Sequence, residues 1–256
     1  MRRLILAVML IISPGHALRA EGLFQELPEP GKWCRYDTVV LANYEGTPSP
    51  VSEQSGELTV SALDVVEHNG RAYQWIEIEF ASEVLTRDAG KAPIARTIYK
   101  FLVQRDQLQS GANPLAHVAR AWNRESDGEL QQVDVANFSS AEAGALVARL
   151  VLGEPLENRT QVGIPKRLTL GEEELVSEEG ISGKMPSKKV GGGLKMGGQI
   201  TLWPHESAGF GVLAAEHLYD VEITEEQNGV FTLTIAVQLE LAEAGDGAVS
   251  KLPEQR

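Results

Sequence analysis

Cysteine and histidine are both scarce in this sequence of 256 residues. Cys34 is the single cysteine, so a disulfide within the chain is excluded. The histidines beyond residue 20 are scattered at His68, His117, His205 and His217. No spacing among these residues fits a metal site or a nucleophile paired with a general base. The sequence therefore predicts no metal, no cofactor and no catalytic residue. Enzymatic activity is left to a site that no motif identifies, and a non-catalytic protein is favoured.

Long apolar runs are absent except at the N-terminus. Arg2 and Arg3 precede an apolar run over residues 4–12, and small residues follow at Ala17 and Ala20. This is the layout of a secretory signal peptide, and the run is too short for a transmembrane helix, which needs about 20 apolar residues. We therefore expect a signal peptide over residues 1–20, cleaved after Ala17 or Ala20. The mature protein should be exported to the periplasm or the extracellular space, with no transmembrane segment.

Basic residues are outnumbered, with 23 lysines and arginines against 36 acidic residues and a net charge of −13. Removal of residues 1–20 takes away three arginines and no acidic residue, which lowers the net charge to −16. An acidic surface repels phosphate backbones, so we expect no nucleic-acid partner. The same charge favours solubility.

Alternation of apolar and polar residues predicts a β-hairpin in the N-terminal half. Residues 56–66 and residues 73–80 both alternate with a period of two. Asn69-Gly70 lies between them and suits the positive φ angles of a tight turn. Strands with two unlike faces are typical of an antiparallel sheet.

A second hairpin is predicted near the C-terminus. The residues of 230–241 alternate between apolar and mostly polar side chains, and residues 219–224 precede them. Asn228-Gly229 supplies the turn between the two strands.

Two helices are predicted between these strand-rich regions. Pro114 begins a segment, residues 114–123, whose apolar residues have helical spacing. Residues 139–152 begin with Ser139 and Glu142, a pair that fits a capping box.

Strands at both ends with helices between them indicate an α+β fold. We expect a twisted antiparallel sheet or half-barrel with about two helices packed on one face. A single domain over residues 31–242 is predicted, followed by a tail over residues 243–256, and separate N- and C-terminal domains are the alternative. The predicted core contains Trp33, Tyr36, Leu58, Val60, Ile76, Ile78, Leu146, Leu150, Phe231, Leu233 and Ile235.

Two further features carry weaker signals. Glu77 and Glu79 lie on one strand face, about 7 Å apart at the rise of a strand. Glycosidases use paired carboxylates, but a solvated sheet face is the commoner arrangement. Residues 183–198 contain four lysines, several glycines and no acidic residue, which predicts a mobile loop or a hairpin tip.

The segment Gly31-Lys32-Trp33-Cys34-Arg35-Tyr36, together with the hairpin around Asn69-Gly70, resembles a class of uncharacterised secreted bacterial proteins that open with a Gly-x-Trp-x-x-Tyr strand. Residues 245–253 are similar to the ends of the same proteins. More distantly, the layout resembles periplasmic lipoprotein carriers, whose antiparallel half-barrel is closed by helices. The resemblance implies such an architecture and assigns no site residue.

We therefore expect an exported, non-catalytic binding or carrier module for an apolar or lipid-like ligand. The aromatic content is only 6%, and small aliphatic residues leave room for an apolar ligand. Leu146, Val147, Leu150 and Val151 are the expected ligand-binding residues. A core-filling role is the alternative for these four, and an envelope or extracellular structural or interaction protein is the alternative function.

Overall fold

The computed structural model describes residues 19–44, 52–86, 90–91, 95–109, 111–126, 128–135, 143–191, 194–225 and 229–253. Residues 1–18, in which most of the expected signal peptide falls, lie outside these ranges. All the strand pairs among the described residues are antiparallel.

The first half of the chain supplies the strands β1 (Arg19–Glu21), β2 (Trp33–Tyr44), β3 (Ser52–His68), β4 (Arg71–Thr86), β5 (Gly90–Lys91), β6 (Ala95–Gln104), β7 (Val118–Glu125) and β8 (Gln131–Val133). The second half supplies β9 (Glu154–Val162), β10 (Lys166–Leu170), β11 (Glu173–Ser177), β12 (Gly180–Gly191), β13 (Leu194–Pro204), β14 (Val212–Glu225) and β15 (Gly229–Gly245). Helical segments are the 3-10 helices η1 (Arg105–Gln107) and η2 (Pro114–His117) and the α-helix α1 (Ala143–Leu152).

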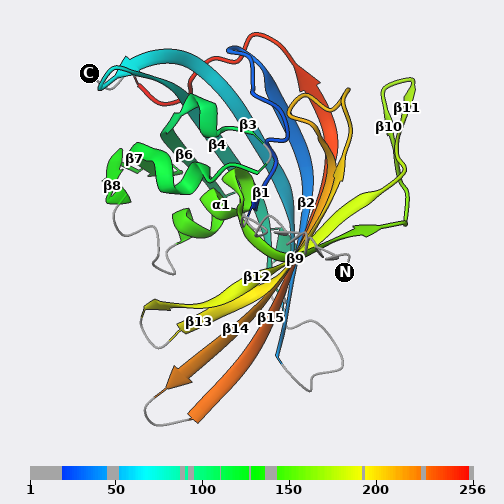
Figure 1. The fold of residues 1–256 in the computed structure, drawn as a ribbon. Helices are drawn as coiled ribbons and strands as arrows, with labels where there is room; N and C mark the ends of the chain where they lie inside the picture. The colour runs from blue at the N-terminus through cyan, green and yellow to red at the C-terminus, as the bar shows by residue number, and fades with distance from the viewer. Residues whose placement is uncertain are drawn as a thin grey trace, which may run out of the picture.

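One large sheet joins the two halves of the chain. Its strand order is β1-β9-β12-β13-β14-β15-β2-β3-β4-β6-β7-β8, with β5 paired to β4, and β10 and β11 form a separate hairpin. The last long strand, β15, pairs with β2 along Leu233–Gly245 and Trp33–Tyr44. This pairing joins the strands of the second half of the chain to those of the first half in one sheet. Figure 1 shows the sheet strongly curled, with α1 lying against its inner surface.

The predicted α+β class is wrong. Strands make up 69% of the structure and helical residues 7%, and the described residues contain one α-helix. The predicted helix over residues 114–123 is replaced by η2 and then by β7, which pairs with β6. Tertiary contacts outweigh the local helical spacing in this segment, since β7 pairs with β6 and Trp122 packs against Trp75 of β4.

The second predicted helix is present as α1, and the part of the prediction over residues 139–142 lies outside the described residues. Both predicted hairpins are confirmed in their pairing. Residues 56–62 pair with residues 76–82, and Asn69 and Gly70 have φ values of 52° and 72°. Residues 219–224 pair with residues 230–235, while Asn228 lies outside the described residues.

Residues from both halves share one apolar core on the inner face of the sheet. Six of the predicted core residues are buried, namely Tyr36, Leu58, Val60, Ile76, Ile78 and Leu150. Trp33, Leu233 and Ile235 are half-buried, and the side chain of Leu146 lies outside the described part. Phe231 was predicted to be buried but is 40% exposed, because it lies at the end of β15 where the helix no longer covers the sheet (Figure 1).

The lysine- and glycine-rich segment, residues 183–198, is mostly strand rather than loop. It supplies much of β12 and the start of β13, which pair with each other. Gly198 has a φ of 152°, and a Cβ there would collide with the carbonyl oxygen of Leu218 on β14. Glycine at this position therefore allows β13 and β14 to approach closely.

Candidate functional site

An apolar cavity lies between α1 and the inner face of the sheet. Its volume is about 380 Å³, within the range of about 300–1,000 Å³ that small-molecule pockets occupy. Seven strands and the helix contribute to its walls, and no charged side chain is among the lining residues of the described part. The lining consists of Thr38, Val40, Gln54, Phe80, Thr97, Tyr99, Val147, Leu150, Leu194, Met196, Tyr219, Val221, Ile235 and Val237.

The exposure of the lining residues distinguishes a floor from a mouth. Thr38, Tyr99 and Tyr219 are 2%, 3% and 5% exposed. Two positions further along the same strands, the next inward-facing residues are half-buried. These residues are Val40, Thr97 and Val221. The cavity therefore closes at the first set of residues and opens beyond the second.

The mouth of the cavity carries exposed apolar side chains. Phe231 pairs with Ile223, which pairs in turn with Leu194 in the cavity wall. Tyr44, at the same end of the sheet, is 47% exposed. In Figure 1 the ends of β13, β14 and β15 extend past α1 at the bottom of the molecule. Apolar residues at an opening of this kind are typical of ligand-binding and interaction surfaces.

Two polar side chains are buried at or beside the floor. The Oγ1 of Thr38 has no hydrogen-bond partner among the described residues. On β14, Nδ1 of His217 lies 3.2 Å from the hydroxyl of Tyr219, while Nε2 of His217 is likewise unpartnered within the described residues. Burial lowers the pKa of His217 to about 3, so its side chain is uncharged near neutral pH.

The four expected ligand-binding residues of α1 lie in different environments. Val147 and Leu150 line the cavity. Val151 is fully buried in the core and is not among the lining residues. The side chain of Leu146 lies outside the described part of the chain. The sequence did not identify Thr38, Tyr219 and the other strand residues of the lining as ligand-binding residues. Their only signal was the period-two alternation that places every second residue of a strand on the inner face.

A cluster of polar and charged side chains lies on the outer face of the sheet. Glu77 on β4 is 3% exposed and lies beneath the C-terminal segment. One of its oxygens accepts a hydrogen bond of 2.6 Å from the hydroxyl of Ser250, and the other accepts one of 2.8 Å from the backbone N–H of Lys251. The ammonium of Lys100 on β6 donates to the same hydroxyl at 2.8 Å.

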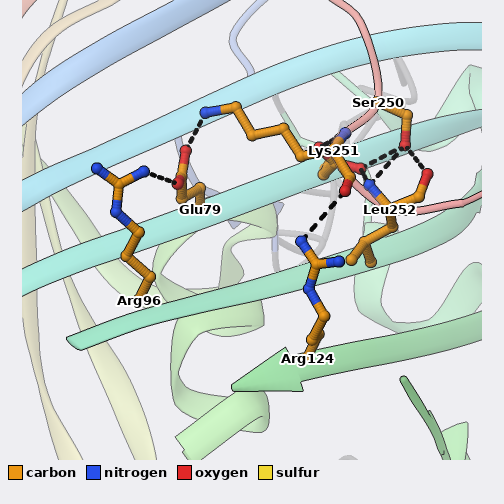
Figure 2. Close-up of polar contacts among 7 residues, drawn as sticks. Glu79, Arg96, Arg124, Ser250, Lys251 and Leu252 are labelled. Carbon is orange, nitrogen blue, oxygen red and sulfur yellow. Dashed lines mark hydrogen bonds and ion pairs between the residues drawn. The ribbon is translucent and has the colours of Figure 1, made fainter. Parts of the chain in front are cut away.

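Glu79 extends this cluster along β4. Its carboxylate is paired with the ammonium of Lys251 and, at 3.2 Å, with the guanidinium of Arg96. Arg124 on β7 donates to the carbonyl oxygen of Lys251 at 3.2 Å. Figure 2 shows Arg96 and Lys251 pointing towards Glu79, and Arg124 pointing towards the backbone of residues 250–252, which cross the strands as a strap.

The expectation of a solvated face around Glu77 and Glu79 is therefore wrong. The carboxylates are covered by residues more than 170 positions away in sequence, a distance that strand periodicity does not reveal. The strap adds an apolar contact, since Leu252 is 3% exposed. The donors of the strap and of Arg96 occupy the carboxylates of this cluster, so its visible role is to hold the C-terminal segment on the sheet.

Cys34 is buried on β2, and burial raises the pKa of its thiol to about 12. Among the described residues, no group of three or more histidine, cysteine, aspartate or glutamate side chains is placed to hold a metal ion. Nor does any helix among them have the length and apolar character needed to cross a bilayer.

No family model matches this chain, and no curated protein matches it. Among solved structures, the chain is similar to the crystal structure of a beta-barrel-like protein of a domain of unknown function, DUF1849, from Brucella abortus. The identity is 7% and the TM-score is 0.29, and the match covers 86% of this chain and 99% of the other. Similarity at this level supports no conclusion about function. Any functional argument therefore has to come from the residues of this chain.

Proposed function

We propose that this protein is an exported, non-catalytic binding or carrier module that holds an apolar, lipid-like ligand in the cavity beneath α1. The observation that carries the proposal is the cavity itself, whose lining is dominated by aliphatic and aromatic side chains without a charge. A concave apolar site with a few polar groups is the usual form of a small-molecule site.

The exposed rim supports the same function. Phe231 is 40% exposed and Tyr44 is 47% exposed at the open end of the sheet. Complete burial of a large apolar side chain contributes about 1.5–3 kcal/mol, and each of these two side chains forgoes a part of that free energy. An apolar chain that entered past these side chains would cover part of their surface, which favours entry at this end.

Titration with the uncharged dye Nile red tests the proposal. Saturable binding with enhanced fluorescence is expected for the wild-type protein. Val147→Phe on α1 and Val221→Phe on β14 fill the cavity from opposite walls, and each should weaken dye binding by about 10-fold or more, equivalent to about 1.4 kcal/mol. Native mass spectrometry of protein purified from its host should show a co-purified apolar molecule in the wild type.

Val249→Phe is the matched control, because Val249 is 78% exposed, precedes the strap and is not among the residues that line the cavity. This variant should bind the dye as the wild type does. Circular dichroism establishes that each variant is folded. Absence of saturable binding by the wild type, together with ligand-free protein from the host, would reject the carrier function and favour an envelope interaction protein.

Export is a separate part of the proposal and rests on the N-terminal sequence. Intact-mass measurement of the protein from its native host should give a chain that begins after Ala17 or Ala20. A mature chain that retains Met1 would contradict export through a cleaved signal peptide.

A further inference from the structure

The floor of the cavity contains a hydroxyl group that no other residue in the described part of the chain uses for a hydrogen bond. Thr38 is 2% exposed, and its Oγ1 lines the cavity without a partner among the described residues. Buried polar groups in proteins are almost always hydrogen-bonded. An unmet hydroxyl costs free energy, so its position at the closed end of an apolar cavity calls for an explanation.

The surroundings of Thr38 limit which ligand group could reach it. The described lining residues include no lysine, arginine or acidic residue. A carboxylate, phosphate or ammonium group at the floor would lose its hydration without gaining an opposite charge, which is strongly unfavourable. A neutral hydroxyl, ester or amide would lose much less hydration and could exchange a hydrogen bond with the threonine hydroxyl, which both donates and accepts.

The direction of entry follows from the exposure gradient. The closed end lies at Thr38 and the open end lies near Phe231. A ligand group that meets Thr38 must therefore be at the end of the chain that enters first.

We propose that the cavity selects a single uncharged aliphatic chain with a neutral hydrogen-bonding group at its leading end, and that Thr38 is the partner of that group at the floor. This inference rests on the proposed function, since it assigns the ligand class of the same cavity. Thr38 acts here as a specificity-determining residue, and the aliphatic walls supply the affinity.

Competition for bound Nile red by three probes of equal chain length tests the inference. The probes are 1-dodecanol, dodecane and dodecanoate, each used below the concentration at which it aggregates. The wild type should bind 1-dodecanol about 3- to 10-fold more tightly than the Thr38→Val variant does, a ratio expected for one neutral hydrogen bond. Dodecane should bind both proteins equally, and dodecanoate should bind the wild type more weakly than 1-dodecanol.

Thr234→Val is the matched control, because Thr234 lies half-buried on β15 but is not among the residues that line the cavity. It should leave the ratio of 1-dodecanol to dodecane affinity unchanged. Stability gives a second readout: Thr38→Val removes an unpartnered hydroxyl while nearly conserving shape, so the ligand-free variant should melt at the same or a higher temperature than the wild type.

The outcomes separate the two proposals. If Thr38→Val binds 1-dodecanol as tightly as the wild type, or loses dodecane affinity in parallel, the role of Thr38 is rejected while apolar binding stands. Tighter binding of dodecanoate than of 1-dodecanol would overturn the neutral ligand class. If neither Nile red nor any probe binds the wild type, the proposed function itself fails and the inference fails with it.

Discussion

Glu77 and Ser250 are joined by a hydrogen bond of 2.6 Å across 173 positions of sequence. The bond fixes the C-terminal strap to the outer face of the sheet at a carboxylate that is 3% exposed. The same carboxylate also accepts the backbone N–H of Lys251 at 2.8 Å. The cavity lies on the inner face of the same sheet. Strand β4 therefore carries the strap on its outer face and contributes Phe80 to the cavity on its inner face.

Replacement of Glu77 by glutamine should loosen the strap. The amide keeps the size of the side chain but replaces one accepting oxygen with a donor, which leaves Ser250 or Lys251 without an acceptor. The expected loss is about 1–3 kcal/mol in the free energy of unfolding, measured by urea titration, with faster proteolytic removal of the C-terminal residues. Glu222→Gln is the control, since Glu222 is 44% exposed and paired with Lys195, and it should cost less than about 1 kcal/mol. Equal effects of the two substitutions would contradict the assigned role of Glu77.

The strap should also depend on the apolar contact of Leu252. Leu252→Ala removes a side chain that is 3% exposed, and such truncations cost about 2–5 kcal/mol in a protein core. The strap can detach without global unfolding, so the loss in the free energy of unfolding should lie at the low end of that range. Hydrogen exchange of the Lys251 and Leu252 amides should become faster in this variant. Val249→Ala is the matched control next to the strap. Val249 is 78% exposed, so its truncation should change neither the free energy of unfolding nor the hydrogen exchange. Unchanged exchange in Leu252→Ala would show that polar contacts alone hold the strap.

The hairpins were predictable because their information is local. Asn69-Gly70 sets the turn geometry, and alternation in the flanking strands sets the register that pairs Val60 with Ile78. The segment that begins at Val118 was not predictable in the same way. Its apolar residues fit a helical stripe, but the segment pairs with the edge of β6 instead. The ring centroids of its Trp122 and of Trp75 on β4 lie 5.2 Å apart. Such tertiary contacts outweigh weak local preference.

The candidate site was predictable only in part. Helical spacing placed Val147 and Leu150 on one face, and both line the cavity. Thr38 and Tyr219 could not be selected from the sequence, because their importance comes from strands that are neighbours in space and distant along the chain. The burial of Glu77 depends on residue 250 in the same way. Contacts between distant segments are the information that a periodicity argument lacks.

The thiol of Cys34 should be unreactive in the folded protein. It is fully buried, its Sγ lies close to the backbone of Gly209, and burial raises its pKa to about 12. A thiol reagent at pH 8 should label the native protein at least about 100-fold more slowly than the protein in guanidinium chloride, because reaction requires opening of the structure. Val249→Cys supplies an exposed thiol for comparison and should react at an ordinary rate. Rapid labelling of native Cys34 would show that β2 opens readily near this residue.

The buried imidazole of His217 should make the folded protein less stable in acid. Burial lowers the pKa of this histidine from 6.5 to about 3, so between those values the unfolded chain binds a proton that the folded chain does not. The free energy of unfolding should therefore be unaffected by this group above about pH 6.5 and should fall as the pH decreases from 6.5 towards 3, by up to about 1.4 kcal/mol per pH unit. His217→Phe removes the titrating group and its unpartnered Nε2, so its stability should decline less steeply across that window. Urea titrations at several pH values measure the difference, with His68→Phe as the control because His68 is half-buried beside Tyr73. Parallel decline of the His217→Phe and wild-type proteins would show that His217 accepts a proton in the folded state about as readily as in the unfolded chain.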